Sequence, residues 1–267
     1  MTHIATAIAI MGCAMEQLRQ NARAIARHIG PAYLLWVVVT IALQWAAHGQ
    51  ISAAPLFITF DDGETSQNAS GWLIALSAFI HTAAYIYIAV AWHRVALRPD
   101  AVRPDAGHLG QYLWRLVQQT LILVIPIIIF ALVSVSASVS AITGAIYNEV
   151  LWPLALNIES VLNFLFAVCI GWVLLRFGLI LPAAAVGHDG YELGASWKDT
   201  AKFAWPLVWI AVVEAGLWSA SAWLVAKAGH LGDGAAFFVD VFTWPIPFLL
   251  GLSVLTYLYR GLADDTE

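Results

Sequence analysis

Six long stretches of apolar residues constrain this chain more than any other feature. Each approaches the length of about 20 residues that an α-helix needs to cross a bilayer. They cover residues 33–47, 71–92, 116–141, 160–175, 203–226 and 236–259. The first and fourth need a few flanking residues to reach across. Only helices and closed barrels satisfy their backbone hydrogen bonds in lipid, so we predict an all-α, polytopic membrane protein with six transmembrane helices.

The composition agrees with a chain that is solvated mainly by lipid. Of its 267 residues, 61% are hydrophobic and 11% are charged, whereas a soluble domain carries about 25% charged residues. Too few polar side chains remain to cover a water-facing shell. Twelve basic residues also argue against a nucleic-acid-binding face, and we expect no nucleic-acid partner.

The basic residues predict how the chain threads the bilayer. An excess of lysine and arginine marks the cytoplasmic side, and every basic residue except Lys227 falls on one side of the six-span threading. We therefore predict a multi-pass protein of the bacterial inner membrane with both termini in the cytoplasm. The outer loop around Asp61, Asp62 and Glu64 lacks basic residues. Tryptophans near both predicted interfaces, Trp45, Trp72, Trp152 and Trp223 outside and Trp92, Trp114 and Trp205 inside, indicate an aromatic belt.

Residues 1–30 have the pattern of an amphipathic helix. An apolar stripe recurs every three or four residues, and Arg19, Arg23 and Arg27 lie on another face. The stripe comprises Ile4, Ile8, Met11, Met15, Leu18, Ala22, Ile25 and Ile29. We expect an interfacial helix in the headgroup plane, with packing on a partner subunit as the alternative. Residues 31–260 then form the six-helix domain, and residues 261–267 form a short acidic tail.

A joint follows Arg176. The apolar run 177–186 is too short to span the bilayer and is interrupted by Pro182, so we expect an interfacial segment. Ser196 and Asp199 have the spacing of a capping box, with aspartate in place of the usual glutamate or glutamine. This spacing predicts that the fifth span begins nearby.

The joint carries a resemblance to a known family. The runs RFGLILPAAAVG and ASWKDT, and IAVAWHRVALRPD earlier in the chain, resemble uncharacterised bacterial inner-membrane proteins grouped with the membrane domain associated with glycerophosphoryl diester phosphodiesterases. Arg176, Pro182, Ser196 and Thr200 are the matching positions. The resemblance implies a six-helix membrane domain without established chemistry. The sequence has no phosphodiesterase-like stretch with paired acidic metal ligands, so that activity is not implied.

Three ionisable residues lie within the predicted spans, where such groups suggest function. His81 and Glu214 are central in the second and fifth spans, and Asp240 is one turn into the sixth. Histidine titrates near neutrality, so His81 paired with either acid could relay a proton or cation. The alternative, which we favour, is that these groups hydrogen-bond across helices as packing contacts. Cys13 and Cys169 lie apart without a Cys/His cluster, and we expect no metal and no cofactor.

Other features bear on packing and partners. Ser134, Ser136, Ser138 and Ser140 give the third span a face of small residues, which allows close approach of a neighbouring helix or a partner. Prolines interrupt the third span at Pro126 and the sixth at Pro245 and Pro247. Broken helices line the substrate sites of many transporters, although a structural kink is the simpler interpretation.

No motif for catalysis is present. The sequence lacks HExxH, GxSxG and a paired-aspartate motif, so we assign no catalytic residue and do not expect an enzyme. We favour a non-catalytic scaffold or accessory subunit of a membrane complex. The alternative is a small secondary transporter or channel that uses His81, Glu214 and Asp240. A cavity joining these side chains would favour transport, and a tightly packed bundle would favour the accessory role.

Overall fold

The computed structural model describes residues 2–48, 71–147, 151–188 and 190–264. For residues 47, 48, 71, 73, 74, 101, 133–147, 151–159, 263 and 264 it describes the backbone alone. Every regular element in these ranges is helical. The elements are α1 (His3–Gln20), α2 (Ala22–His28), α3 (Gly30–His48), α4 (Gly71–Leu97), η2 (Pro99–Ala101), α5 (Ala106–Tyr147), α6 (Leu151–Phe177), α7 (Ile180–Ala185), α8 (Leu193–Asp199), η3 (Thr200–Phe203), α9 (Ala204–Gly229), α10 (Asp233–Thr243) and α11 (Pro245–Asp264).

The described helices confirm a multi-pass membrane protein. Five segments are long and apolar enough to cross a bilayer: Ala75–Leu97, Ala106–Leu132, Ser160–Phe177, Leu193–Gly229 and Asp233–Leu262. They overlap the second to sixth predicted spans. The first predicted span passes only when α2 and α3 are taken together, and these helices meet at a 49° bend. The structure therefore supports five spans, or six if that bent pair crosses as one.

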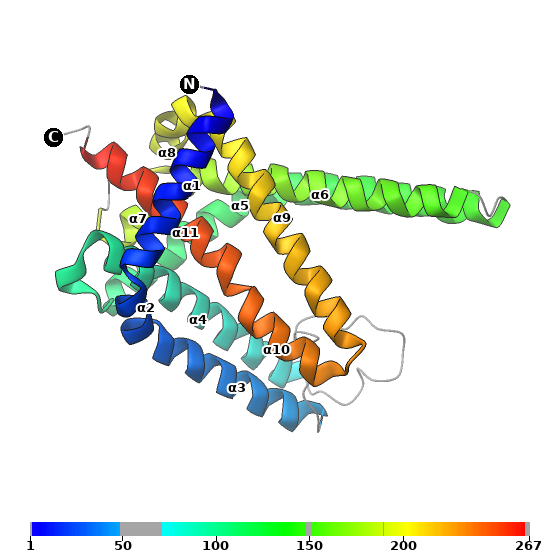
Figure 1. Cartoon of the computed structure of the whole chain (residues 1–267), viewed down its shortest axis with the longest axis horizontal. Coiled ribbons are helices and arrows are strands. Elements are labelled where there is room, and N and C mark those ends of the chain that lie inside the picture. The colour runs from blue at the N-terminus through cyan, green and yellow to red at the C-terminus, as the bar shows by residue number, and fades with distance from the viewer. Residues whose placement is uncertain (1, 49–70, 148–150, 189, 265–267) are drawn as a thin grey trace.

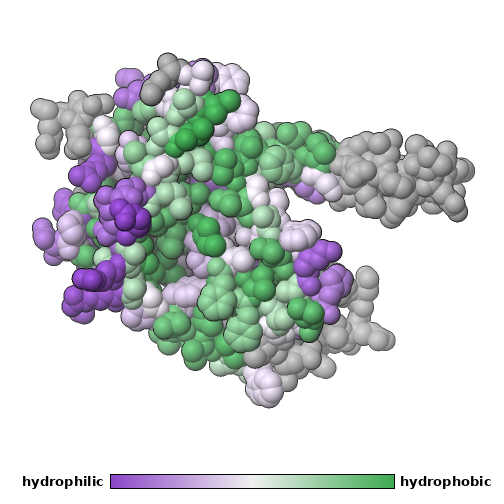
Figure 2. Space-filling view, in the orientation of Figure 1, coloured by the Kyte–Doolittle hydropathy of each residue, from purple (hydrophilic) through white to green (hydrophobic). Residues whose placement is uncertain are grey.

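The helices form a bundle from which one pair extends (Figure 1). Helices α3, α4, α9, α10 and α11 make up the body, and α1 lies across α9 and α11. Helix α5 packs on α6, and both continue beyond the other helices. Hydrophobic side chains cover much of the visible face of the bundle, while hydrophilic ones gather mainly at the left of the view (Figure 2). Such a surface suits contact with lipid along the helices.

The short helix α7 lies inside the bundle, not at its surface. All six of its residues are buried, and it packs against α4, α5 and α11. The Arg94 guanidinium, itself buried, donates a hydrogen bond to the Ala185 carbonyl at the end of α7 (2.9 Å). This apolar run is therefore covered by three neighbouring helices instead of lying exposed on the surface of the bundle.

The amino-terminal helix is held by a different face from the predicted stripe. Ala7, Ile10 and Ala14 of α1 are buried, and α1 packs on α9 and α11 of the same chain. Small side chains at two of these positions let the helix axes approach closely. Ile8 and Met15, both from the predicted stripe, remain more than half exposed. The packing partner of α1 is thus this bundle itself.

Two other predictions differ from the structure. Trp92 is fully buried in the core beside α7, so it does not belong to an aromatic belt. Trp45, Trp72, Trp114, Trp205 and Trp223 are exposed, as a belt requires. The acidic tail predicted from residue 261 is still part of α11 as far as Asp264. Asp61, Asp62, Glu64 and the side chains of Trp152 and of the serine face, Ser134 to Ser140, lie outside the described residues.

Candidate functional site

A cavity of about 220 Å³ brings together two of the three predicted intramembrane residues. His81 of α4 and Asp240 of α10 both line it, whereas Glu214 does not. The remaining lining comes from α3, α4, α9, α10 and the residue between α10 and α11. It consists of Trp36, Thr40, Gln44, Tyr85, Trp218, Phe237, Val241 and Trp244.

Helix α3 supplies one side of the cavity through regular spacing. Trp36, Thr40 and Gln44 follow one another at intervals of four, which places their side chains on one helix face. They are 6%, 4% and 2% exposed. A hydroxyl and an amide are costly to bury in an apolar helix unless they meet polar partners. This face of α3 therefore indicates a polar site.

Three aromatic rings form one wall of the cavity. The Trp36 and Trp244 rings lie 5.5 Å apart at 76°, and those of Tyr85 and Trp244 lie 4.9 Å apart at 77°. Both pairs have the edge-to-face geometry that aromatic rings prefer. The His81 ring meets Trp36 edge-on at 5.2 Å. Each ring is thus oriented by its neighbours, so the wall is fixed before any ligand arrives.

The sixth span lacks one backbone hydrogen bond at this cavity. Helices α10 and α11 meet at Trp244, which keeps α-helical dihedral angles and precedes Pro245. Pro245 has no N–H to donate to the Val241 carbonyl, the acceptor four residues earlier. The Tyr33 hydroxyl of α3 donates to this carbonyl instead. A neighbouring helix therefore satisfies this carbonyl, and Tyr33 contacts both Val241 and the Trp244 ring.

Several polar atoms of the lining have no hydrogen-bond partner. Among the described residues, none bonds to the buried Trp36 Nε1, Thr40 Oγ1 or Trp244 Nε1. Asp240 forms no ion pair within the described ranges. The His81 Nδ1 donates to the Ser77 carbonyl of its own helix at 2.8 Å, which orients the imidazole. Unsatisfied buried donors are costly, so these atoms indicate a site that is completed by a polar occupant.

Glu214 has a different environment from Asp240. It packs against Gly251 of α11, where an added Cβ would lie 3.1 Å from Glu214 Oε1. Its Oε1 is buried, and the described residues provide no donor for it. The missing side chain at Gly251 is what leaves room for the carboxyl group between α9 and α11. Glu214 thus belongs to a helix contact apart from the cavity.

The predicted joint assembles around Arg176. This buried arginine stacks on Trp197, with its guanidinium carbon 3.9 Å from the ring centroid. It donates to the carbonyls of Trp197 at 2.7 Å and Thr200 at 3.4 Å. No carboxylate of the described ranges pairs with it. Arg176 therefore fastens the end of α6 to α8 through carbonyl oxygens and an aromatic face.

Ser196 and Thr200 also contact Arg176. Pro182 lies in the buried helix α7. Ser196 Oγ donates to the Arg176 carbonyl (2.9 Å) and accepts from the Leu179 amide (3.3 Å), while Thr200 Oγ1 donates to the Arg176 carbonyl (3.1 Å). The predicted capping box is therefore wrong: Ser196 is inside α8, and its hydroxyl serves the end of α6. Helix α9 begins at Ala204 after a 3-10 turn.

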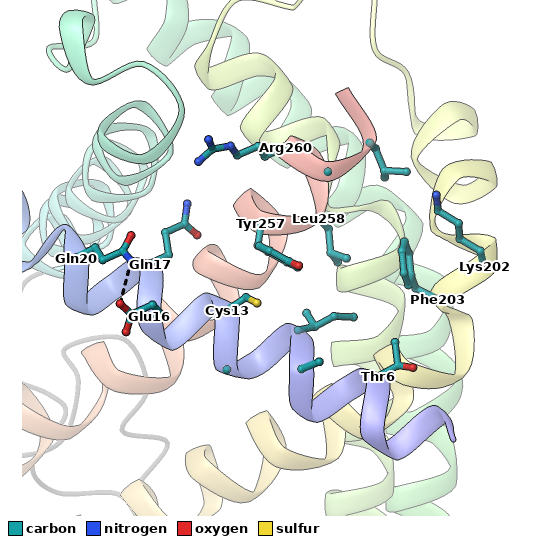
Figure 3. A pocket seen from close by; sticks show the side chains of 15 residues that line it. Thr6, Cys13, Glu16, Gln17, Gln20, Lys202, Phe203, Tyr257, Leu258 and Arg260 are labelled. Atoms are coloured by element: carbon teal, nitrogen blue, oxygen red, sulfur yellow. Dashed lines mark hydrogen bonds between the residues drawn. The ribbon is translucent and has the colours of Figure 1, made fainter. Parts of the chain in front are cut away.

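A second cavity, of about 640 Å³, lies between α1, η3 and α11. Figure 3 shows Glu16, Gln17 and Gln20 on α1, Arg260 on α11 and Lys202 on the far side. Glu16 accepts two hydrogen bonds from Arg19, at 2.6 and 2.7 Å, which lower the pKa of its carboxyl to about 2. Because Glu16 is already paired with Arg19 within α1, the other charged side chains of the lining are the cations Lys202 and Arg260.

Sequence reasoning missed most of the lining of the smaller cavity. The one available signal was the recurrence of Trp36, Thr40 and Gln44 on a single face of an apolar helix. Trp218 and Trp244 gave no such signal among thirteen tryptophans, nor did Tyr85 among eight tyrosines. The described residues include no group of three or more His, Cys, Asp or Glu side chains that could hold a metal ion. No family model, curated protein or solved structure matches this chain.

Proposed function

We propose that this chain is a small membrane transporter that binds a polar solute in the cavity between α3, α4 and α10. The observation that carries the proposal is the shared lining by His81 and Asp240 of one cavity within the predicted spans. Ionisable residues within spans mark substrate and ion pathways in many transporters. This geometry moves our preference from the accessory role to transport.

The setting of the transporter follows from the sequence. We place it in the bacterial inner membrane with both termini in the cytoplasm, because lysine and arginine concentrate on one side of the threading. The family resemblance through Arg176, Pro182, Ser196 and Thr200 fits a membrane domain that has no enzymatic activity of its own.

Accessibility of the cavity from both sides of the membrane tests this function without a known substrate. In a background with Cys13→Ser and Cys169→Ser, since both native thiols are exposed, Thr40→Cys places a thiol in the cavity. We expect a membrane-impermeant thiosulfonate to label it when added to right-side-out vesicles and also to inverted vesicles. Ile128→Cys, on the exposed apolar surface of α5, is the control and should not react. A transporter must open its cavity to each side of the membrane in turn. Labelling of Thr40→Cys from one side alone would therefore contradict the proposal.

An accessory role is the second candidate, and one observation favours it. Helices α5 and α6 continue beyond the bundle (Figure 1), and an apolar groove of about 380 Å³ runs between them beside the stacked rings of Phe130 and Phe166. Partners would bind there, on the serine face from Ser134 to Ser140, or through the amino-terminal helix. The measurement is recovery of the intact protein in mild detergent: a stoichiometric partner, recovered reciprocally, supports this role, and a lone protein argues against it.

A further inference from the structure

We propose that the cavity lined by Asp240 and Trp244 binds a small organic cation, an ammonium compound that also carries a hydrogen-bond acceptor. This inference names the solute class of the proposed transporter and so rests on that proposal. Four properties of the cavity point to the same class: its charge, its aromatic wall, its unpartnered donors and its size.

The charge comes from Asp240. This side chain is half-buried within a span, and no cation of the described ranges pairs with it. A carboxylate in apolar surroundings is costly without a compensating positive charge. His81 lines the same cavity but is oriented by Ser77 of its own helix. A bound cation would supply the missing countercharge.

The aromatic wall suits an alkylated ammonium better than a metal ion. Ammonium groups are attracted to the faces of aromatic rings, most strongly to tryptophan, within about 6 Å of the ring centre. Trp36, Tyr85 and Trp244 form one wall, and Trp218 and Phe237 are the other aromatic carbocyclic residues of the lining. Metal ions such as Ca²⁺ require about six to eight oxygen ligands, whereas Asp240 contributes the one carboxylate here.

The unpartnered atoms indicate which group the ligand carries besides its ammonium. Trp36 Nε1 and Trp244 Nε1 can only donate hydrogen bonds, and Thr40 Oγ1 can donate or accept. A ligand with a hydroxyl or carboxyl oxygen next to its ammonium group satisfies these donors. A volume of about 220 Å³ is below the roughly 300–1,000 Å³ of sites for drug-sized ligands. The ligand is therefore no larger than a simple amino alcohol or amino acid derivative.

A titration of the purified full-length protein in detergent tests the proposal through its own tryptophan fluorescence. Choline is the probe, and 3,3-dimethyl-1-butanol is a neutral analogue with nearly the same shape. We expect saturable quenching by choline at a concentration at least tenfold lower than that required for the alcohol. In Asp240→Asn the preference for choline should disappear. Asp233→Asn, an exposed acid on the same helix, is the matched control and should bind as the wild type does.

The wild-type comparison decides the matter even if Asp240→Asn does not fold. Equal affinity for choline and the neutral alcohol would overturn the proposal, as would no saturable quenching by choline, ethanolamine or tetramethylammonium. Failure of the transport proposal gives a different pattern. In that case choline binds with the expected selectivity, while Thr40→Cys reacts from one side of the membrane alone.

Discussion

The hydroxyl of Tyr33 donates a hydrogen bond to the carbonyl of Val241, joining α3 to α10 one turn before Pro245 of the last span. The acceptor is the one that Pro245 leaves open, because proline has no N–H for the residue four positions earlier. Tyr33 also contacts the Trp36 and Trp244 rings, with centroids 5.5 and 6.0 Å away. One residue therefore satisfies the open carbonyl and contacts two rings of the aromatic wall of the cavity.

This relationship predicts that Tyr33→Phe destabilises the protein by about 1–3 kcal/mol, the cost of leaving a buried carbonyl unsatisfied. The apparent melting temperature in detergent measures the loss. Pro245→Ala restores an N–H for the Val241 carbonyl, so Tyr33→Phe should cost clearly less in that background. Equal losses in both backgrounds would show that the hydroxyl does not serve this carbonyl.

At Gly178 the structure leaves no room for the methyl group of an alanine. A Cβ there would lie 2.5 Å from the Leu174 carbonyl oxygen and 2.7 Å from Leu255 Cδ2. Gly178→Ala should therefore destabilise the turn between α6 and α7 by about 1–3 kcal/mol, as overpacking does in other cores. Gly194→Ala, in α8 with nothing within 4 Å of its Cβ, is the control. Thermal unfolding should separate the two variants, and similar melting temperatures would refute the close approach.

Arg176 should not be replaceable by lysine. Its guanidinium stacks on Trp197 and reaches two carbonyls at once, which a compact ammonium group cannot reproduce. We expect Arg176→Lys to lose about 1.5–3 kcal/mol, the range for a hydrogen bond to a charged group. Arg260→Lys, at an exposed position, should change the melting temperature little. A loss as large in the control would mean that detergent contacts, and not the buried cluster, dominate the measurement.

Most of the membrane architecture was predictable, because length and hydropathy alone identify helices that can cross a bilayer. The burial of α7 was not, since an apolar run such as 177–186 looks the same whether lipid or neighbouring helices surround it. The stripe on α1 failed for a related reason: Ala7 and Ala14 pack closely because they are small, while hydropathy gives more weight to Ile8. Pairing of His81 with Asp240 was one of two combinations left open, and only the helix arrangement separates Asp240 from Glu214.

The start of α5 should contribute less to stability at low pH. Asp105 precedes this helix and accepts from the His108 backbone amide (2.9 Å) and ring Nδ1 (2.6 Å), and these bonds lower the pKa of its carboxyl. Because the folded-state pKa lies below the ordinary value of 3.8, the contribution to stability is complete above that pH. It is lost as the pH falls through the lowered pKa.

Two substitutions separate the cap from the charge. Asparagine also caps helices well, so Asp105→Asn should lose the acid-sensitive part alone, whereas Asp105→Ala should lose the cap as well. Melting temperatures measured from pH 7 downward should rank wild type above the asparagine variant, and that above alanine, with the first difference vanishing at low pH. A constant difference across this range would exclude ionised Asp105 as its source.

Substitutions of Glu214 and Asp240 should have different effects: the first should change stability, and the second should change ligand preference. Glu214 lies against Gly251, away from the cavity, so Glu214→Gln keeps the shape of that contact and should leave the choline titration within about twofold of the wild type. Glu214→Ala removes the buried side chain and should cost about 1–3 kcal/mol in stability without altering ligand preference. Asp240→Asn should do the reverse, with a melting temperature near that of the wild type and no preference for choline over its neutral analogue. Because both substitutions to an amide remove one carboxylate from the same bundle, a general effect of charge would affect them equally. If Glu214→Gln abolished the preference as Asp240→Asn does, the countercharge would belong to both acids and the site could not be confined to the cavity at Trp244.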